Sequence, residues 1–224
     1  MELFFTKAFE NLPPGEKESF YKTVILQDPS EYAEMLRIEY YRTVLKHLGE
    51  DVRIGANVKI VNPQYISIGD GVTICDGVTL IARGPGGITL GDRVVLNDRV
   101  YLDTETSDVG YIKVENDVYI GTGTTLFGHS GFEIGDHALL AQNITSTPYS
   151  HQYRDPNRNI IDQGGFTRKI TIGRDSYVGM GVCIMYSADV GEGSVVGSGS
   201  VVVKSIPPYS IAVGNPAKVI KERK

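Results

Sequence analysis

Aliphatic residues recur at every sixth position in the most regular stretch of the chain, residues 172–206. A small or β-branched residue follows each of them four positions later. A helix repeats about every 3.6 residues and a strand every two, so neither element produces this spacing. A period of six is typical of a β-solenoid in which three hexapeptides form one triangular turn. The aliphatic positions are Ile172, Val178, Ile184, Val190, Val196 and Val202.

The same period extends back to Ile54 and predicts an all-β solenoid of about seven turns. Each turn buries its apolar side chains only because its neighbours are present, so we expect one continuous core along the axis. The expected inward positions, turn by turn, are Ile54, Ile60 and Ile66; Ile68, Ile74 and Leu80; Leu90, Leu96 and Leu102; Val114, Ile120 and Leu126; Ile134, Leu140 and Ser146; Ile172, Val178 and Ile184; and Val190, Val196 and Val202.

One interruption of the period is much longer than the others. The step from Ser146 to Ile172 leaves twenty residues outside the repeat, which predicts an extruded loop over residues 147–171. A long loop in an otherwise compact repeat is usually functional or disordered. Its tyrosines, arginines and single histidine are not the composition of a disordered linker, so we expect a functional loop.

The N-terminal segment, residues 1–50, lacks the period and predicts helices. Asp28 is the expected N-cap of the main helix, with Pro29 at its first position and Gly49 as its stop. A shorter helix is expected from about Glu16 to Leu26. We expect this segment to cover the open end of the solenoid, because an unpaired strand edge invites aggregation.

The solenoid is expected to occupy residues 51–206 and to end at Pro207 and Pro208, which cannot donate to a hydrogen-bonding ladder. The C-terminal tail, residues 207–224, is then expected to pack along the side of the solenoid. It concentrates lysines in a chain whose net charge is −5. This net charge argues against nucleic acid as the main partner.

No stretch of about 18 apolar residues is present to span a membrane, and the N-terminus lacks a signal-peptide pattern. These features predict a cytoplasmic protein. Cys75 and Cys183 fall in different turns, and no histidine or cysteine spacing suggests a metal site.

The repeats that begin with an aliphatic residue and glycine, as in Ile68-Gly69-Asp70 and Ile134-Gly135-Asp136, resemble those of the hexapeptide-repeat acyltransferases. The closing motifs, Lys204 to Pro208 and Gly214 to Ile220, strengthen the likeness. The similarity covers about residues 52–221 and is greatest to the maltose, galactoside and capsule-sugar O-acetyltransferases. It implies a left-handed parallel β-helix, an enzyme that uses acetyl-CoA, a homotrimer with active sites between neighbouring solenoids, and a role in polysaccharide biosynthesis.

In this family a loop histidine acts as the catalytic base, and the matching residue is His151. Imidazole suits this chemistry because its pKa of about 6.5 lets it take a hydroxyl proton near neutral pH. The resemblance places a backbone N–H at Met180 against the developing thioester oxyanion. The residues that match coenzyme A contacts are Gly179, Ser198, Gly199, Lys204, Lys218 and Lys221.

The acceptor side departs from the galactoside enzymes, which have an asparagine where this chain has Gly123. Many relatives have a tryptophan at the position of Tyr177. The register puts His129 one turn beneath the root of the loop, so His129, Tyr149, Arg154 and Tyr177 are the candidates for binding the acceptor. For His129 alone, a corner residue that fills a short bulge is the competing interpretation.

Three functions remain open from the sequence. The first is transfer of an acetyl group to a hydroxyl of a sugar or glycan, and the second is acetylation of a nucleotide-linked amino sugar with the same base. The third is a γ-carbonic-anhydrase-like or scaffold role. A metal site of that class needs converging histidines, and His129, His137 and His151 lack its spacing.

Overall fold

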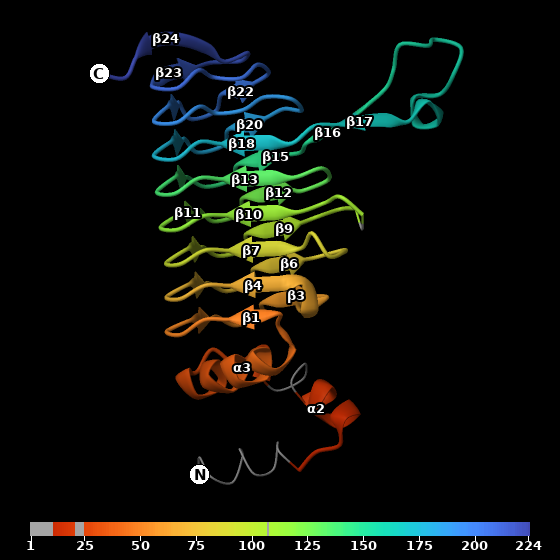
Figure 1. Ribbon diagram of the computed structural model, residues 1–224, viewed down its shortest axis with the longest axis vertical. Coiled ribbons are helices and arrows are strands. Elements are labelled where there is room, and N and C mark those ends of the chain that lie inside the picture. The colour runs from red at the N-terminus through yellow and green to blue at the C-terminus, as the bar shows by residue number, and fades with distance from the viewer. Residues whose placement is uncertain (1–10, 21–24, 107) are drawn as a thin grey trace.

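The computed structural model describes residues 11–20, 25–106 and 108–224. Its main body is a left-handed parallel β-helix of seven coils and a partial eighth, stacked into a column (Figure 1). Each of the first six coils contributes one short strand to each of three sheets, which form the three faces of the column. The strands are short because the chain must turn a corner about every six residues.

The first face consists of β1 (His47–Leu48), β4 (Ile66–Ile68), β7 (Ile88–Leu90), β10 (Ile112–Val114), β13 (Phe132–Ile134) and β18 (Ile170–Ile172). The second face consists of β2 (Arg53–Ile54), β5 (Thr73–Ile74), β8 (Val95–Leu96), β11 (Tyr119–Ile120), β14 (Leu139–Leu140), β19 (Tyr177–Val178), β21 (Val195–Val196), β23 (Ser210–Val213) and β24 (Lys218–Glu222). The third face consists of β3 (Lys59–Val61), β6 (Thr79–Ile81), β9 (Tyr101–Asp103), β12 (Thr125–Phe127), β15 (Thr145–Ser146), β20 (Cys183–Ile184) and β22 (Val201–Val202). The turns that follow the first, second and third faces along the chain are called the first, second and third corners.

The stacked aliphatic residues predicted from the period form the core. On the second face, Ile54, Ile74 and Leu96 lie in register and are at most 1% exposed. Ser146 takes its predicted inward place, and its hydroxyl donates to Ile184 O at 3.1 Å. Because the side chains repeat with the coils, each residue packs against its equivalent one coil away.

The predicted register is wrong in the first coil. Leu48, which was expected on the helix, pairs with Ile68 and opens that coil on the first face. Ile66 was expected to close the first coil. It lies instead on the first face of the second coil, in β4, where it pairs with Ile88 of the third coil. The reason is a 3₁₀ turn, η2 (Pro63–Tyr65), which adds two residues to the step after Ile60.

The N-terminal segment contains α2 (Pro14–Phe20) and α3 (Glu31–Val44). Residues 21–24 of the shorter predicted helix lie outside the described residues. The N-cap of α3 is Ser30 rather than Asp28, because Ser30 Oγ accepts from the Ala33 amide at 3.2 Å. Gly49 is not the stop, since α3 ends five residues earlier and the chain then enters β1.

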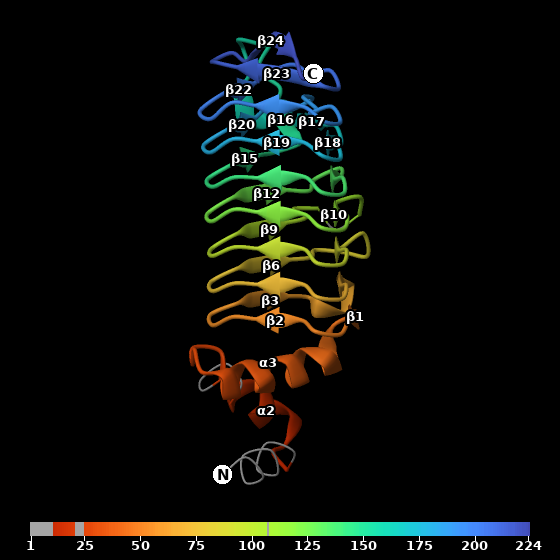
Figure 2. The ribbon, with the colours of Figure 1, turned by 90° about the vertical axis from the view of Figure 1, so that its left-hand side faces the viewer.

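Helix α3 lies across the open end of the column (Figure 2). The buried Arg37 donates from Nε to Ile54 O at 2.9 Å, and Tyr41 donates from its hydroxyl to Val58 O at 3.4 Å. These carbonyls belong to the first coil, where no preceding coil supplies an N–H. Side chains of α3 therefore satisfy acceptors that the edge of the solenoid would leave unpaired.

The prediction that the chain leaves the solenoid at Pro207 and Pro208 is wrong. Ile206 still bridges to Val190 on the first face, and β23 then adds a strand to the second face beside β21. Pro207 and Pro208 occupy the first corner, where no ladder N–H is needed. Strand β24 turns back antiparallel to β23 and ends the sheet.

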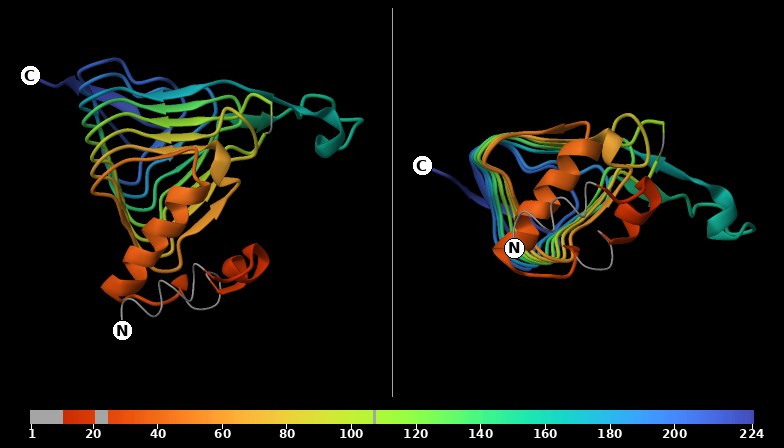
Figure 3. Two further views of the ribbon diagram at one scale, coloured as in Figure 1. Left: turned by 60° about the horizontal axis from the view of Figure 1, so that its bottom comes forward. Right: turned by 90° about the horizontal axis from the view of Figure 1, so that it is seen from below.

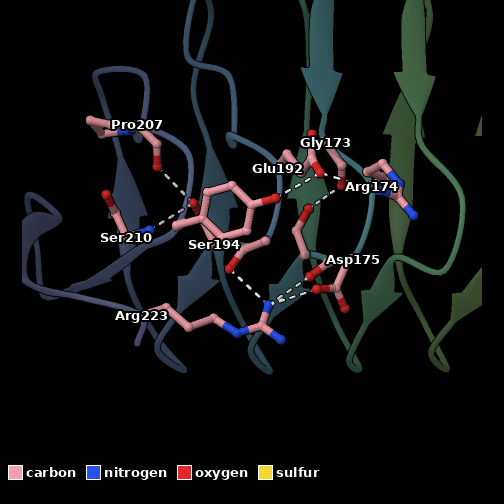
Figure 4. Close-up of polar contacts among 11 residues, drawn as sticks. Gly173, Arg174, Asp175, Glu192, Ser194, Pro207, Ser210 and Arg223 are labelled. Atoms are coloured by element: carbon pink, nitrogen blue, oxygen red, sulfur yellow. Dashed lines mark hydrogen bonds and ion pairs between the residues drawn. The ribbon is translucent and has the colours of Figure 1, made fainter.

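The end of the tail is fastened at the same corner (Figure 4). Arg223 Nη1 donates to Asp175 Oδ2 at 3.0 Å and to Gly193 O at 2.8 Å, which ties β24 to two coils below. Ser194 Oγ donates to Pro207 O at 2.6 Å. The C-terminal end of the solenoid is thus closed by a strand and its anchors, as the other end is closed by α3.

Candidate functional site

The longer insertions of the repeat all leave the column at the third corner (Figures 1 and 3). Each one follows a third-face strand, after β6, β9, β12 and β15 in turn. Because the coils are stacked, these insertions lie above one another although they are about 20 residues apart in sequence. The predicted loop 147–171 is the longest and forms an arm that projects away from the column.

The arm is a hairpin with structure of its own. Strand β16 (Tyr149–His151) pairs antiparallel with β17 (Gly165–Thr167), and η3 (Ile160–Gln163) lies near the tip. At the root, the Phe166 ring lies 4.8 Å from the Tyr186 ring, and Arg168 donates to Asp189 Oδ2 at 2.6 Å. These contacts fix the arm to the sixth coil.

The side chain of Gln163 makes three hydrogen bonds to the backbone near the tip of the arm. Gln163 Nε2 donates to Asp155 O and Arg158 O, both at 2.9 Å, and Gln163 Oε1 accepts from the Asp155 amide at 3.1 Å. A hollow of about 320 Å³ beside it is lined by Gln152, Tyr153, Arg154 and Phe166. Arg154 therefore lies on the arm beyond the histidine.

His151, the predicted base, is exposed near the root of the arm. Its ring contacts the Tyr149 ring, which in turn contacts the His129 ring. The Tyr149 ring meets the His151 ring edge-on at 4.9 Å, with Tyr149 Oη 3.5 Å from His151 Nδ1. The His129 ring stacks on the Tyr149 ring, with the ring centres 5.1 Å apart and an angle of 21° between the planes. The structure thus brings together three of the predicted site residues.

His129 is half-buried beneath the arm. Burial lowers the pKa of His129, although the negative charges of Glu105 and Asp103 act in the opposite direction. Among the residues that the structure describes, His129 Nδ1 and Ser130 Oγ are buried without a hydrogen-bond partner. The neutral imidazole is therefore the favoured form at this position.

The buried carboxylate of Asp103, one coil below His129, and its ion pair with Arg83 were not predicted from the sequence. Asp103 is 0% exposed, and Arg83 donates to both of its oxygens at 2.8 and 2.7 Å. Tyr101 donates to Asp103 Oδ2 at 3.0 Å. Burial tends to raise the pKa of Asp103, but hydrogen bonds from Arg83, the Glu105 amide and Tyr101 outweigh it and hold the pKa below its usual value. The only signal in the sequence was the surplus of residues after Leu102.

The expected coenzyme positions lie mainly at the second corner. The Gly199 amide donates to Met180 O at 2.8 Å, so the two turns are stacked. A Cβ built on Gly179 would lie 2.6 Å from Ser198 N, so only glycine fits there. Gly199 has φ +69° and open space around the position of a Cβ. This corner therefore presents backbone that a ligand can approach closely.

The Met180 N–H makes no hydrogen bond to any described residue. The equivalent amide in the first coil, that of Ala56, donates to Asp76 Oδ1 at 2.8 Å. At the upper coils an aspartate in that place is replaced by Ser198. The Met180 amide thus lacks the acceptor that an aspartate supplies to Ala56.

The remaining candidates are spread over the column. Lys218 pairs with Val213 near the second corner, whereas Lys221 pairs with Ile211 further along β24. Lys204 follows β22 at the third corner. Tyr177 lies on the second face and is 40% exposed, away from the arm.

His151 and Met180 lie at different corners, with the third face between them. One chain therefore does not place the predicted base beside the predicted oxyanion donor. In the described ranges, no three His, Cys, Asp or Glu side chains converge into a metal site. No helix of those ranges is long and apolar enough to cross a membrane.

A family model, the hexapeptide repeat of succinyl-transferase, matches residues 47–82 and 169–204. A probable acetyltransferase of Mycobacterium tuberculosis is 32% identical over 166 residues, which make up 74% of this chain and 54% of that protein. Galactoside O-acetyltransferase of Escherichia coli is 31% identical over 134 residues, 60% of this chain and 63% of that protein. The chain thus spans about half to just under two thirds of the length of these relatives.

Among solved structures, a mutant of the Bacillus cereus N-acyltransferase AntD, in complex with dTDP-4-amino-4,6-dideoxyglucose and coenzyme A, has a TM-score of 0.61. The likeness covers 84% of this chain and 89% of that one at 23% identity, which bears on the fold alone. The repeat, the coil architecture and the sequence relatives agree: the chain carries the hexapeptide repeat, and the relatives that it resembles are acetyltransferases.

Proposed function

We propose that this protein transfers an acetyl group from acetyl-CoA to a hydroxyl of a sugar or glycan unit. The observation that supports this most strongly is the ordered arm that holds His151 above the third corner, fixed to the sixth coil at its root. The E. coli galactoside O-acetyltransferase relative favours a hydroxyl acceptor.

His151 acts as the general base in this proposal. Its imidazole takes the proton of the acceptor hydroxyl while the oxygen attacks the thioester carbonyl carbon. The Met180 N–H donates to the oxyanion that develops. When the carbon–sulfur bond breaks, the leaving thiolate takes the proton from the imidazolium, so the base returns to its neutral form.

Acetyl-CoA would run along the open backbone of Gly179, Ser198 and Gly199, with Lys218 near its phosphates. Lys204 lies at the third corner, on the same side as the arm. A homotrimer would bring the second corner of one solenoid against the arm of its neighbour. Such a trimer would reunite the groups that one chain holds at separate corners.

The test is thiol release from acetyl-CoA with a panel of hydroxyl sugars and amino sugars. In His151→Ala we expect transfer to fall by about 10²–10⁴-fold, while thermal stabilisation by acetyl-CoA is kept. A wild-type protein that releases no thiol with any acceptor and is not stabilised by acetyl-CoA would refute the proposal. Transfer to amino sugars alone would refute the hydroxyl acceptor and retain the base.

A further inference from the structure

Among the described residues, the ring contact and the side-chain hydrogen bond of His151 are both made with Tyr149. Both residues lie on β16, two positions apart, so their side chains leave the same side of the strand. Across the hairpin His151 pairs with Gly165, which has no side chain to contact the imidazole. The orientation of the ring therefore depends on Tyr149.

Tyr149 is confined on two sides. The His129 ring is stacked on it at 5.1 Å. A Cβ built on Gly165 would lie 2.2 Å from the Tyr149 hydroxyl oxygen and 2.3 Å from its Cζ, so β17 closes tightly over the phenol. A ring packed in this way has little freedom to rotate, and its hydroxyl is held near Nδ1 of His151.

His129 is itself fixed from below. Its carbonyl oxygen accepts from Thr106 Oγ1 at 2.7 Å, and the Phe127 ring lies edge-on at 6.2 Å. Burial, which lowers the pKa of His129, favours the neutral ring in this stack. A continuous series of packed rings thus runs from the fourth coil to His151.

Resting on the proposed function, we propose that Tyr149 is a positioning residue that sets the tautomer of His151, with His129 as its support. The two nitrogens of neutral imidazole are not equivalent, and the hydrogen bond made by one decides the protonation of the other. If the His151 Nδ1–H donates to Tyr149 Oη, the lone pair is left on Nε2, which points away from the phenol. Nε2 is then the nitrogen that takes the acceptor proton.

The distance of 3.5 Å is at the long end for such a hydrogen bond. Catalytic hydrogen bonds in structures without substrate are often long and shorten in the reactive complex. The hydroxyl also stabilises the imidazolium, because Nδ1–H still donates to it after Nε2 is protonated. Tyr149 therefore orients His151 both before and after the imidazole takes the proton.

The experiment compares Tyr149→Phe with the wild-type protein and with Tyr153→Phe. The first variant keeps the ring that stacks on His129 and removes only the hydroxyl. The control removes a hydroxyl two positions beyond the histidine on the same arm, where the side chain is 68% exposed. Long-range proton–nitrogen NMR of the imidazoles reports the tautomer of His151 without any need for turnover, and His151→Ala assigns its signals.

We expect the wild-type protein and Tyr153→Phe to carry the proton of His151 on Nδ1, and Tyr149→Phe to shift it toward Nε2. In the transfer assay, Tyr149→Phe should lower kcat by about tenfold, the value of one hydrogen bond, with KM for acetyl-CoA unchanged. An unchanged tautomer in Tyr149→Phe would overturn the proposal even if kcat fell. If no transfer occurs in the wild-type protein, the proposed function fails while the tautomer measurement still decides the role of Tyr149.

Discussion

Replacing Arg37 by methionine tests how the open end of the solenoid is closed. Arg37 is 1% exposed and donates to three backbone carbonyls, those of Ile25 and Ile54 at 2.9 Å and of Asp28 at 2.6 Å. Methionine fills much of the same space but donates to none of them. The variant therefore removes the hydrogen bonds while keeping most of the apolar contact.

A hydrogen bond from a charged donor is worth about 1.5–3 kcal/mol. The three bonds of Arg37 together therefore set an upper limit to the stability that the variant can lose. Two effects reduce it. The Asp28 carbonyl is only partly buried and can reach water, and the variant also removes the cost of burying a guanidinium. We expect a net loss of about 2–4 kcal/mol in the stability of the capped end.

Because coils interact only with their neighbours, this loss should be local. Hydrogen exchange should rise in α3 and in the first coil, residues 47–61, and stay unchanged above the third coil. Arg53→Met is the matched control, since Arg53 pairs with Glu34 on the surface and its side chain is 69% exposed. Equal melting and equal exchange in the two variants would show that Arg37 does not seal the edge.

Three shorter predictions concern the arm and the tail. Gly165→Ala should displace the Tyr149 ring and reduce acetyl transfer while the melting temperature of the solenoid stays unchanged, which activity and melting curves measure together. Burial lowers the pKa of His129, so the unfolded chain takes up this proton first as pH falls below about 6.5. The contribution of His129 to stability is therefore complete above that pH and is lost as pH falls through the lower folded pKa, and His129→Gln should show a shallower loss of stability there in urea titrations. Arg223→Ala should raise hydrogen exchange in β24 and leave the other second-face strands protected, because it removes the contacts to Asp175 and Gly193.

The period of six was sufficient to predict the second to seventh coils, because identical geometry demands the same kind of side chain at each inward position. It failed where two patterns overlap. Leu48 continues the apolar face of α3 and also lies six positions before Ile54, so spacing alone could not decide between helix and strand. Prolines were misleading at the other end, because Pro207 and Pro208 sit at a corner rather than in a ladder.

The register also predicted that His129 lies under the root of the arm, since corner residues of successive coils are stacked. It could not predict the Arg83–Asp103 ion pair, because the number of surplus residues in a loop does not determine its path. The pairing of Tyr149 with His151 depends on the hairpin register across Gly165, which a count of residues does not give.

The separation of His151 and Met180 leads to a test of where the complete site forms. His151→Ala removes the proposed base from the arm but leaves the second corner intact. Ser198→Trp places a bulky ring at an exposed position of that corner and leaves the arm intact. Because the chain has no tryptophan of its own, the fluorescence of the new residue identifies this variant in a mixture. Each variant alone should be inactive in acetyl transfer.

If the arm of one subunit meets the second corner of the next, mixed trimers regain a site wherever an intact arm faces an intact corner. Every mixed trimer contains one such interface out of three. Random assembly of equal amounts should therefore restore about one quarter of the wild-type activity. A mixture that stays inactive, although mass spectrometry shows mixed trimers, would mean that each chain must supply both groups to the same site. The two corners of one solenoid would then have to be joined by a movement of the arm across the third face, which the contacts of Phe166 and Arg168 at its root oppose.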